Sequence, residues 1–280
     1  VFAFMSVALG RGKVLQKDGK SGLDIKVLGV PNADVSNLAA LDSSIQHIPT
    51  LKIELSTDIL SNYIFPRNSI SEEFNNTLTE GLSWIYKNKG IKVSSPHIVN
   101  NSQLPEGDYR IYVRDQLITR GRYEKDKFFV LCQLSFAKSF GLKGLAERKH
   151  PITGATYFSS YMDEKDRELL DLLGIKYFSY QSYLALEVVA ALQKSVIEIF
   201  GVSELKALVD SLPQDDQFLV NEVFQPQCIS HSEGVDVMRR LMRDGYFTRD
   251  IKLVLERILE FSSSTPDPGR SRSDWIDSLY

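Results

Sequence analysis

The side chains that most often do chemistry, cysteine and histidine, are few and far apart in this chain. The cysteines are Cys132 and Cys228, and no CxxC spacing joins them. The four histidines show neither an HExxH motif nor paired spacing; they are His47, His97, His150 and His231. A structural zinc site needs closely spaced thiolate or imidazole ligands. The sequence therefore predicts no metal site, and it favours free thiols in a reducing compartment over a disulfide.

Motifs for cofactor or acyl chemistry are also missing from the sequence. No GxxxxGK[ST] or GxGxxG motif follows a strand to cradle a phosphate, and Gly10-Arg11-Gly12 lacks a completing glycine. There is no GxSxG elbow either. Catalytic groups can lie far apart in sequence, so a hydrolase with an unrecognised site stays an alternative. We expect a protein that is not an enzyme and that holds no cofactor.

Charged residues form two local groups. Four carboxylates between Asp163 and Glu168 open a predicted helix, where they complement its dipole. The second group lies on a predicted helical hairpin, with the basic residues Arg239, Arg240, Arg243, Arg249, Lys252 and Arg257. In a helix-turn-helix such residues would contact phosphates. Acidic residues are interleaved with them, and mixed signs favour a solvated or protein-facing surface over DNA; they are Asp236, Asp244, Asp250, Glu256 and Glu260.

Composition also argues against a nucleic-acid-binding protein. The chain has 280 residues, 43% hydrophobic and 25% charged, which is enough for two or three compact units with their own cores. Its formal net charge is −3, whereas a nucleic-acid-binding domain is normally strongly basic. We therefore expect no nucleic-acid partner. A helix-turn-helix DNA-binding regulator with an α/β sensor unit remains the alternative from another class.

A third group brings aromatic and small side chains to the junction of an inserted segment and a long helix. Its members are Pro151, Gly154, Tyr157, Phe158, Tyr180, Tyr183 and Leu186. Core packing is the ordinary interpretation of such residues. A peptide-binding groove is the sharper alternative, because aromatic-lined clefts between lobes are common binding sites.

The first 47 residues differ in character from the rest. Residues 1–9 are apolar or small, and Arg11 and Lys13 follow at once. A membrane span needs about 20 apolar residues, and a signal peptide carries its positive charges before the apolar run. We interpret residues 1–9 as the end of a transmembrane helix, with the basic residues on the cytoplasmic side; a buried, strand-like start is the alternative. Residues 10–47 predict a linker with a short helix near 35–41.

Residues 48–199 predict an α/β subdomain. Leu51, Ile53 and Leu55 alternate with polar residues as in a half-buried strand. A capping box at 69–72 predicts a helix that stops at Gly90. We expect an inserted small lobe at about 115–155, irregular from 135 onward. Further strands are expected at 91–99, 109–114, 116–123, 127–134, 155–160 and 176–179, and helices at 163–173 and about 180–200.

Residues 200–280 predict an all-α subdomain. A capping box, Ser230 with Glu233, opens one helix, and Gly245 ends it. Thr248 is expected to cap a second helix, whose apolar stripe is Ile251, Val254, Leu255, Ile258 and Leu259. The predicted fold class is therefore an α/β (α+β) unit with an inserted small lobe, followed by an all-α helical subdomain.

Several segments resemble, in the same order, the export-gate family (FHIPEP) of flagellar and virulence type III secretion systems. The hairpin QLPEGDYRIYVRDQLITRG at 103–121 resembles the family's LPxxxYRIxxxGxExxxG, and HPITG at 150–154 resembles its dPxfG. EVVAAL at 187–192 with FG at 200–201 is similar to its "vvathL … FG" helix. Arg249-Asp250 and Leu255-Glu256 match the RD and ILE positions of its hairpin. The resemblance runs from about residue 48 to 261.

This resemblance implies a docking platform on the cytoplasmic side of the bacterial inner membrane, joined to transmembrane helices that precede residue 1. It implies a homo-oligomeric ring of nine copies that binds secretion chaperones with their substrates, a gatekeeper, and other proteins of the export apparatus and the ATPase complex. The partner groove would lie at His150, Pro151, Thr153, Gly154, Tyr183 and Leu186. The ring contact would lie at Arg249, Asp250, Lys252 and Arg257. A last subdomain is expected beyond Tyr280.

Three positions depart from the family pattern. Thr153 stands where the family has Phe, a family Trp is replaced near Ser159, and Leu186 stands where the family has a polar residue that faces partners. The departures at Thr153 and Ser159 favour an injectisome over a flagellar system.

Overall fold

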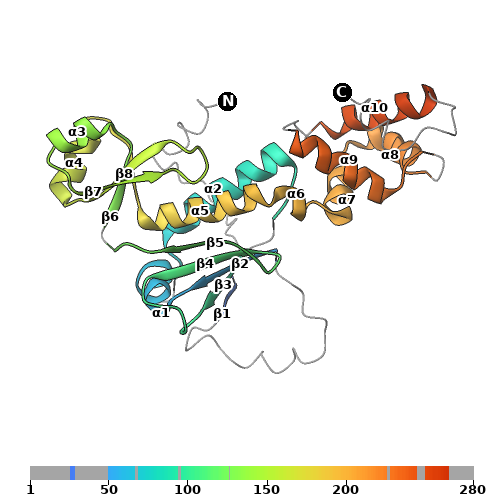
Figure 1. Ribbon diagram of the computed structural model, residues 1–280. Helices are drawn as coiled ribbons and strands as arrows, with labels where there is room; N and C mark the ends of the chain where they lie inside the picture. The colour runs from blue at the N-terminus through green and yellow to red at the C-terminus, as the bar shows by residue number, and fades with distance from the viewer. Residues whose placement is uncertain are drawn as a thin grey trace.

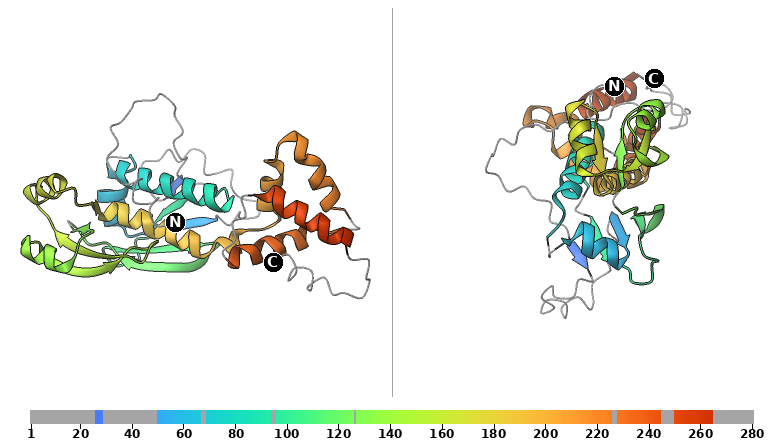
Figure 2. Two further views of the ribbon diagram at one scale, coloured as in Figure 1. Left: turned by 90° about the horizontal axis from the view of Figure 1, so that it is seen from above. Right: turned by 90° about the vertical axis from the view of Figure 1, so that its left-hand side faces the viewer.

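The computed structural model describes residues 26–28, 50–66, 69–93, 96–125, 127–225, 228–244 and 250–264. A five-stranded sheet lies beneath two long helices, with a smaller four-stranded sheet at one end and a group of helices at the other (Figures 1 and 2). Helix α5, Tyr180–Lys194, runs between these ends and connects all three parts.

The five-stranded sheet has the order β1-β3-β2-β4-β5. Its strands are β1 Lys26–Leu28, β2 Leu51–Leu55, β3 His97–Asn100, β4 Asp108–Val113 and β5 Gln116–Arg122. β3 pairs in parallel with β1 and β2, whereas β4 runs antiparallel to both of its neighbours, β2 and β5. The three apolar residues of β2 are fully buried, so the alternation in the sequence matches the pleat of the strand.

Two long helices, α2 Glu72–Lys89 and α5, cover one face of this sheet (Figure 1). The short helix α1 Thr57–Ile59 and the π-helix η2 Leu60–Ile64 follow β2, and α6 Val196–Ile199 follows α5. α2 packs directly on α5, and Gly81 makes the close approach possible: a Cβ there would lie 2.3 Å from Val189 Cγ2. Apolar side chains of these helices and the sheet form one core with the helical end.

The smaller sheet has the order β7-β8-β6-β9, and each of its strands runs antiparallel to its neighbours. Its strands are β6 Lys127–Val130, β7 Lys143–Lys149, β8 Thr156–Tyr161 and β9 Tyr177–Ser179. Two helices, α3 Leu134–Ser139 and α4 Glu164–Leu172, cover it. Four buried apolar residues give this small lobe a core of its own: Val130, Ala137, Leu142 and Leu170.

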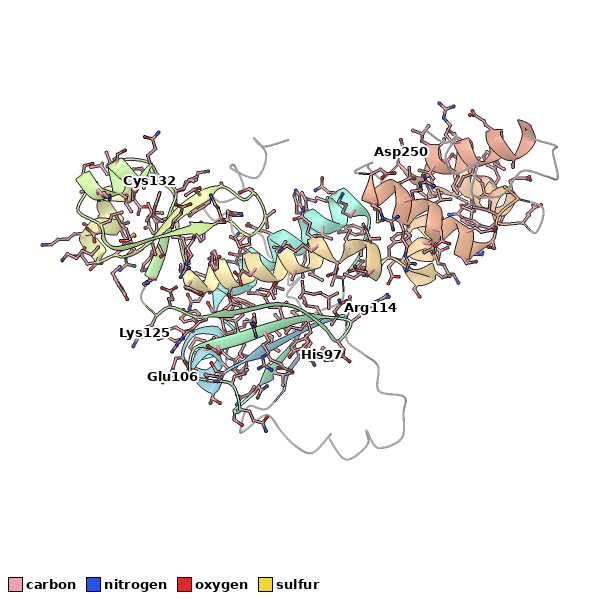
Figure 3. All side chains as sticks on the ribbon, in the orientation of Figure 1. His97, Glu106, Arg114, Lys125, Cys132 and Asp250 are labelled. Carbon is pink, nitrogen blue, oxygen red and sulfur yellow. The ribbon has the colours of Figure 1, made fainter. Side chains whose placement is uncertain are left out.

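After β9, every described element is a helix. The helical end contains α7 Val202–Asp210, the 3-10 helix η4 Gln214–Asp216, α8 Gln217–Val223, α9 His231–Arg243 and α10 Ile251–Ser264. Arg114, in the β4–β5 turn, donates to the carbonyls of Glu198 (3.0 Å) and Ile199 (2.8 Å), so it ties the large sheet to the start of this end (Figure 3).

The predicted mixture of strands and helices is confirmed, as is the capping box at Ser230 and Glu233. The bounds of the inserted lobe were wrong. β5 belongs to the large sheet, and the small sheet takes in residues 127–179 rather than 115–155. The expected irregular stretch contains α3 and β7. The division into subdomains at residues 48, 199 and 280 stays a prediction.

Smaller differences concern helix starts and the linker. α2 is capped by Ser71, whose side chain accepts from the Phe74 amide, and not by a box at 69–72. The linker at 10–47 contains strand β1, which pairs with β3. The membrane-helix end at 1–9, the short helix at 35–41 and the caps at Gly245 and Thr248 lie outside the described residues. None of the described helices combines the length and the apolar character that a membrane span requires.

Candidate partner-docking site

The turn between β7 and β8 is organised by the imidazole of His150. Its Nδ1 accepts hydrogen bonds from the amides of Ile152 (3.2 Å) and Thr153 (3.1 Å). The His150 carbonyl accepts from the amide of Gly154 at 2.9 Å, and Gly154 has a φ of +69°, the left-handed region that glycine adopts without strain. Burial lowers the pKa of His150, which matches an acceptor role that only the neutral ring can fill.

Aromatic rings connect this turn to helix α5. His150 lies 5.2 Å from Tyr157, and Tyr157 lies 5.0 Å from Phe178, measured between ring centroids. Phe178 is stacked on Phe129 at 5.5 Å, and Phe129 is stacked on Tyr183 at 4.2 Å. The residues come from the β7–β8 turn, β8, β9, β6 and α5, so the rings fix the small lobe on the long helix.

A buried carboxylate lies beneath the rings. Glu187, on α5, accepts a hydrogen bond from the hydroxyl of Tyr109 on β4 and another from Tyr183. Burial raises the pKa of Glu187, and burial together with the Glu187 charge raises the pKa of Tyr183. The contact with Tyr109 ties α5 to the large sheet.

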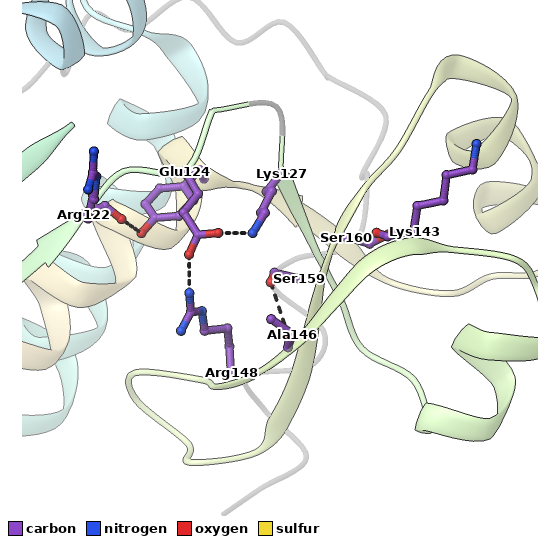
Figure 4. Close-up of polar contacts among 9 residues, drawn as sticks. Arg122, Glu124, Lys127, Lys143, Ala146, Arg148, Ser159 and Ser160 are labelled. Carbon is purple, nitrogen blue, oxygen red and sulfur yellow. Dashed lines mark hydrogen bonds and ion pairs between the residues drawn. The ribbon is translucent and has the colours of Figure 1, made fainter. Parts of the chain in front are cut away.

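A second polar contact joins the small lobe to the segment that enters it. Glu124 accepts from Lys127 and from Arg148, and the Tyr180 hydroxyl donates to the Arg122 carbonyl (Figure 4). Partial burial opposes ionisation of Glu124, but the bonds from the two cations hold its pKa below the ordinary value. The lobe is therefore anchored on both sides of the β7–β8 turn.

The six predicted groove residues do not form one exposed surface. Thr153 and Gly154 are exposed at the tip of the turn, and Pro151 is half-buried. His150 and Leu186 are each 5% exposed and Tyr183 is 9% exposed. His150 and Tyr183 belong to the same aromatic cluster, whereas Leu186 is buried on α5. A partner that binds here would contact the exposed turn itself. His150, Tyr183 and Leu186 would affect binding only through the structure that they support.

The predicted ring-contact residues make contacts inside the chain. Asp250, exposed at the start of α10 (Figure 3), accepts from the Leu253 amide at 3.2 Å, as a helix-capping side chain does. Lys252 is paired with Asp216 at 2.8 Å, and Arg257 with Glu260 at 2.8 Å. Both cations keep exposed side chains, 46% and 61%. Arg249 lies outside the described residues.

Sequence reasoning missed the residues that hold the site together. Phe129 and Phe178 lie on short strands whose pairing could not be read from the chain. Glu187 carried a signal, a charged residue within an otherwise apolar helix stripe, which is a position where a carboxylate needs partners. Among the described residues no cluster of three or more His, Cys, Asp or Glu side chains could hold a metal. The arrangement is suited to binding rather than to catalysis.

Comparisons with known proteins identify relatives. Residues 4–270 match the sequence model of the FHIPEP family. The chain is 28% identical over 176 residues to y4yR of Sinorhizobium fredii, named a probable translocation protein, covering 62% of this chain and 24% of that one. It is 20% identical over 267 residues to the flagellar biosynthesis protein FlhA of Bacillus subtilis, covering 90% and 36%. The chain thus spans about a quarter to a third of these relatives.

Solved structures share the fold. The Chlamydia pneumoniae CdsV protein superposes with a TM-score of 0.70 at 18% identity, over 85% of this chain and 68% of that one; CdsV has also been solved in a complex with CdsO. The nonameric EPEC SctV-C gives a TM-score of 0.57 at 16% identity, over 85% and 64%. FHIPEP proteins are export-gate components of transport systems and not enzymes. Because the family match covers nearly all of its sequence, this chain belongs to the FHIPEP family of type III export-gate proteins.

Proposed function

We propose that this chain is part of the cytoplasmic docking platform of a bacterial type III protein export gate. The observation that supports this most is the family match over residues 4–270. The platform assembles into a homo-oligomeric ring of nine copies, as the EPEC relative does. In this proposal residues 48–199 form the subdomain that carries the partner site, and residues 200–280 form the subdomain that makes ring contacts.

The partner site is centred on the exposed turn at Pro151–Gly154. His150 fixes the shape of this turn from below, and the aromatic cluster holds it at a constant position on α5. A preorganised surface loses little entropy when a partner binds. Secretion chaperones with their substrates and a gatekeeper are the proposed ligands, together with a protein of the ATPase complex, by analogy with the CdsV and CdsO complex.

The ring contact uses the exposed charges of α10. Arg257 and Lys252 are held in place by Glu260 and Asp216 but remain accessible. Charge complementarity across a repeated head-to-tail interface sets register. The protein would sit at the inner membrane through segments outside the described residues. The departures at Thr153 and Ser159 favour an injectisome, although FlhA is among the relatives.

A binding experiment tests the partner site. Leu186 is buried, so replacing it with aspartate would disturb the core and say nothing about binding. Thr153→Arg instead places a long charged side chain on the exposed turn. It should weaken pull-down of a chaperone–substrate complex from the same secretion system by roughly tenfold, whereas Ser203→Arg, on the exposed start of α7, should leave it unchanged. Equal binding by both variants would remove the turn from the partner site.

A further inference from the structure

Helix α4 and the residue that caps its C-terminus expose a row of three leucines. Leu172 is 81% exposed, Leu173 is 51% exposed and Leu169 is 44% exposed. The spacing i, i+3 and i+4 places them side by side on the helix surface. The helix attaches to the lobe through Leu170, which is fully buried in the small core. Exposed leucines are ordinary when scattered, but a contiguous group indicates an interaction surface.

The position of α4 leaves this row accessible. α3 and α4 lie at the free end of the small lobe, away from α5 and from the helical end (Figures 1 and 2). The row is thus separate from the turn at 151–154 and from the charges of α10, and it does not depend on either of them.

Carboxylates border the leucine row. Glu164, Glu168 and Asp171 are exposed and lie along one side of it at helical spacing, while the exposed Lys165 lies one turn before Leu169 on the row itself. The capping box of Asp163 and Asp166 accounts for the acidic start of the helix. It does not account for Glu168, in the middle of the helix, or for Asp171 in the last turn, where a negative charge opposes the helix dipole. Asp171 accepts a hydrogen bond from Tyr177 at 3.3 Å, which orients this carboxylate beside the row.

We propose that α4 docks an amphipathic helix of a partner protein, whose apolar face covers Leu169, Leu172 and Leu173 and whose flanking lysines or arginines meet Glu168 and Asp171. Helix-on-helix docking uses the same i, i+3, i+4 spacing that the row provides. Charge complementarity selects a basic-flanked helix over an acidic one.

Two synthetic helices test the proposal on the whole chain. They share one leucine face and differ only in flanking residues, lysine in one and glutamate in the other. Fluorescence anisotropy should show the lysine-flanked helix binding roughly tenfold tighter, with a preference that shrinks at high salt. Glu168→Lys should narrow this preference. Equal affinity for the two helices would overturn the proposal.

A matched pair of variants locates the site. Leu172→Asp should weaken binding of the lysine-flanked helix at least about tenfold, because the apolar face of that helix then no longer buries a leucine at position 172. Val202→Asp changes a residue that is 50% exposed on α7, and it should bind as the unchanged chain does. Unchanged binding by Leu172→Asp would overturn the proposal. A photocrosslinker placed at position 172 in secreting cells should join this chain to a different protein, and a crosslink between two copies of this chain would also overturn the proposal. Neither outcome bears on ring formation.

Discussion

Acidification should destabilise the protein through His150. The neutral ring accepts two amide hydrogen bonds at Nδ1, and burial lowers its pKa. Above pH 6.5, the ordinary histidine value, the ring is neutral in both the folded and the unfolded chain. Below it the unfolded chain takes up a proton that the folded chain resists, so stability falls as pH decreases, until the folded-state pKa is reached.

The size of this change in unfolding free energy is limited, because His150 binds a single proton. A single group that binds one more proton in the unfolded chain changes the free energy of unfolding by at most about 1.4 kcal/mol per pH unit. His150→Asn removes the titration but keeps an acceptor, because an asparagine side chain can also bond to amides two and three residues on. His150→Ala leaves the two amides without their acceptor and should cost about 1–3 kcal/mol at pH 7.5.

Urea unfolding at pH 7.5, 6.5 and 5.5 measures the effect. The difference in unfolding free energy between the unchanged chain and His150→Asn should shift in favour of the variant between pH 6.5 and 5.5, by at most about 1 kcal/mol. Every other ionisable residue is the same in both proteins, so the difference isolates His150. Parallel pH profiles would refute the acceptor role assigned to the ring.

Two further predictions concern α5. Gly81→Ala places a Cβ 2.3 Å from Val189 Cγ2 and should lower the free energy of unfolding by about 1–3 kcal/mol through overpacking. In a double-mutant cycle measured by urea unfolding, adding Val189→Ala should recover part of this loss. If the costs of the two substitutions simply added, the close packing of α2 on α5 would be contradicted. Glu187→Gln should stabilise the protein most at pH 7.5, because burial raises the pKa of Glu187 and makes the ionised carboxylate costly in the folded chain. This gain in unfolding free energy should shrink as the pH falls toward the pKa that Glu187 has in the unfolded chain. A gain that grew with falling pH would contradict the burial of the charge.

Local patterns allowed much of the large sheet and of the helical end to be predicted. The alternation in β2 and the serine-glutamate pair before α9 are signals contained within a few residues. The small sheet could not be predicted in this way. β6 pairs with β9 across some fifty residues, and β7 consists largely of exposed charged residues, so its apolar alternation is weak. Pairing over such distances depends on tertiary packing.

The candidate site shows the same limit. The resemblance assigns His150 and Tyr183 to one groove, and the aromatic cluster connects the two residues through Tyr157 and Phe178. That this groove binds a partner stays a prediction. The sequence could not show that Leu186 is buried, because an apolar helix residue is compatible with both a groove and a core. Nor could it show that Asp250 accepts from the Leu253 amide at the start of α10, because a sequence fixes the first residue of a helix only to within one or two positions.

Assembly into a ring is the central claim, and native mass spectrometry of the purified chain tests it most directly. We predict a species of nine times the 31.7 kDa chain mass that grows with concentration, and a loss of this species in Arg257→Glu but not in Ser203→Arg. A monomer at every concentration, or a dimer closed by two-fold symmetry, would contradict the account.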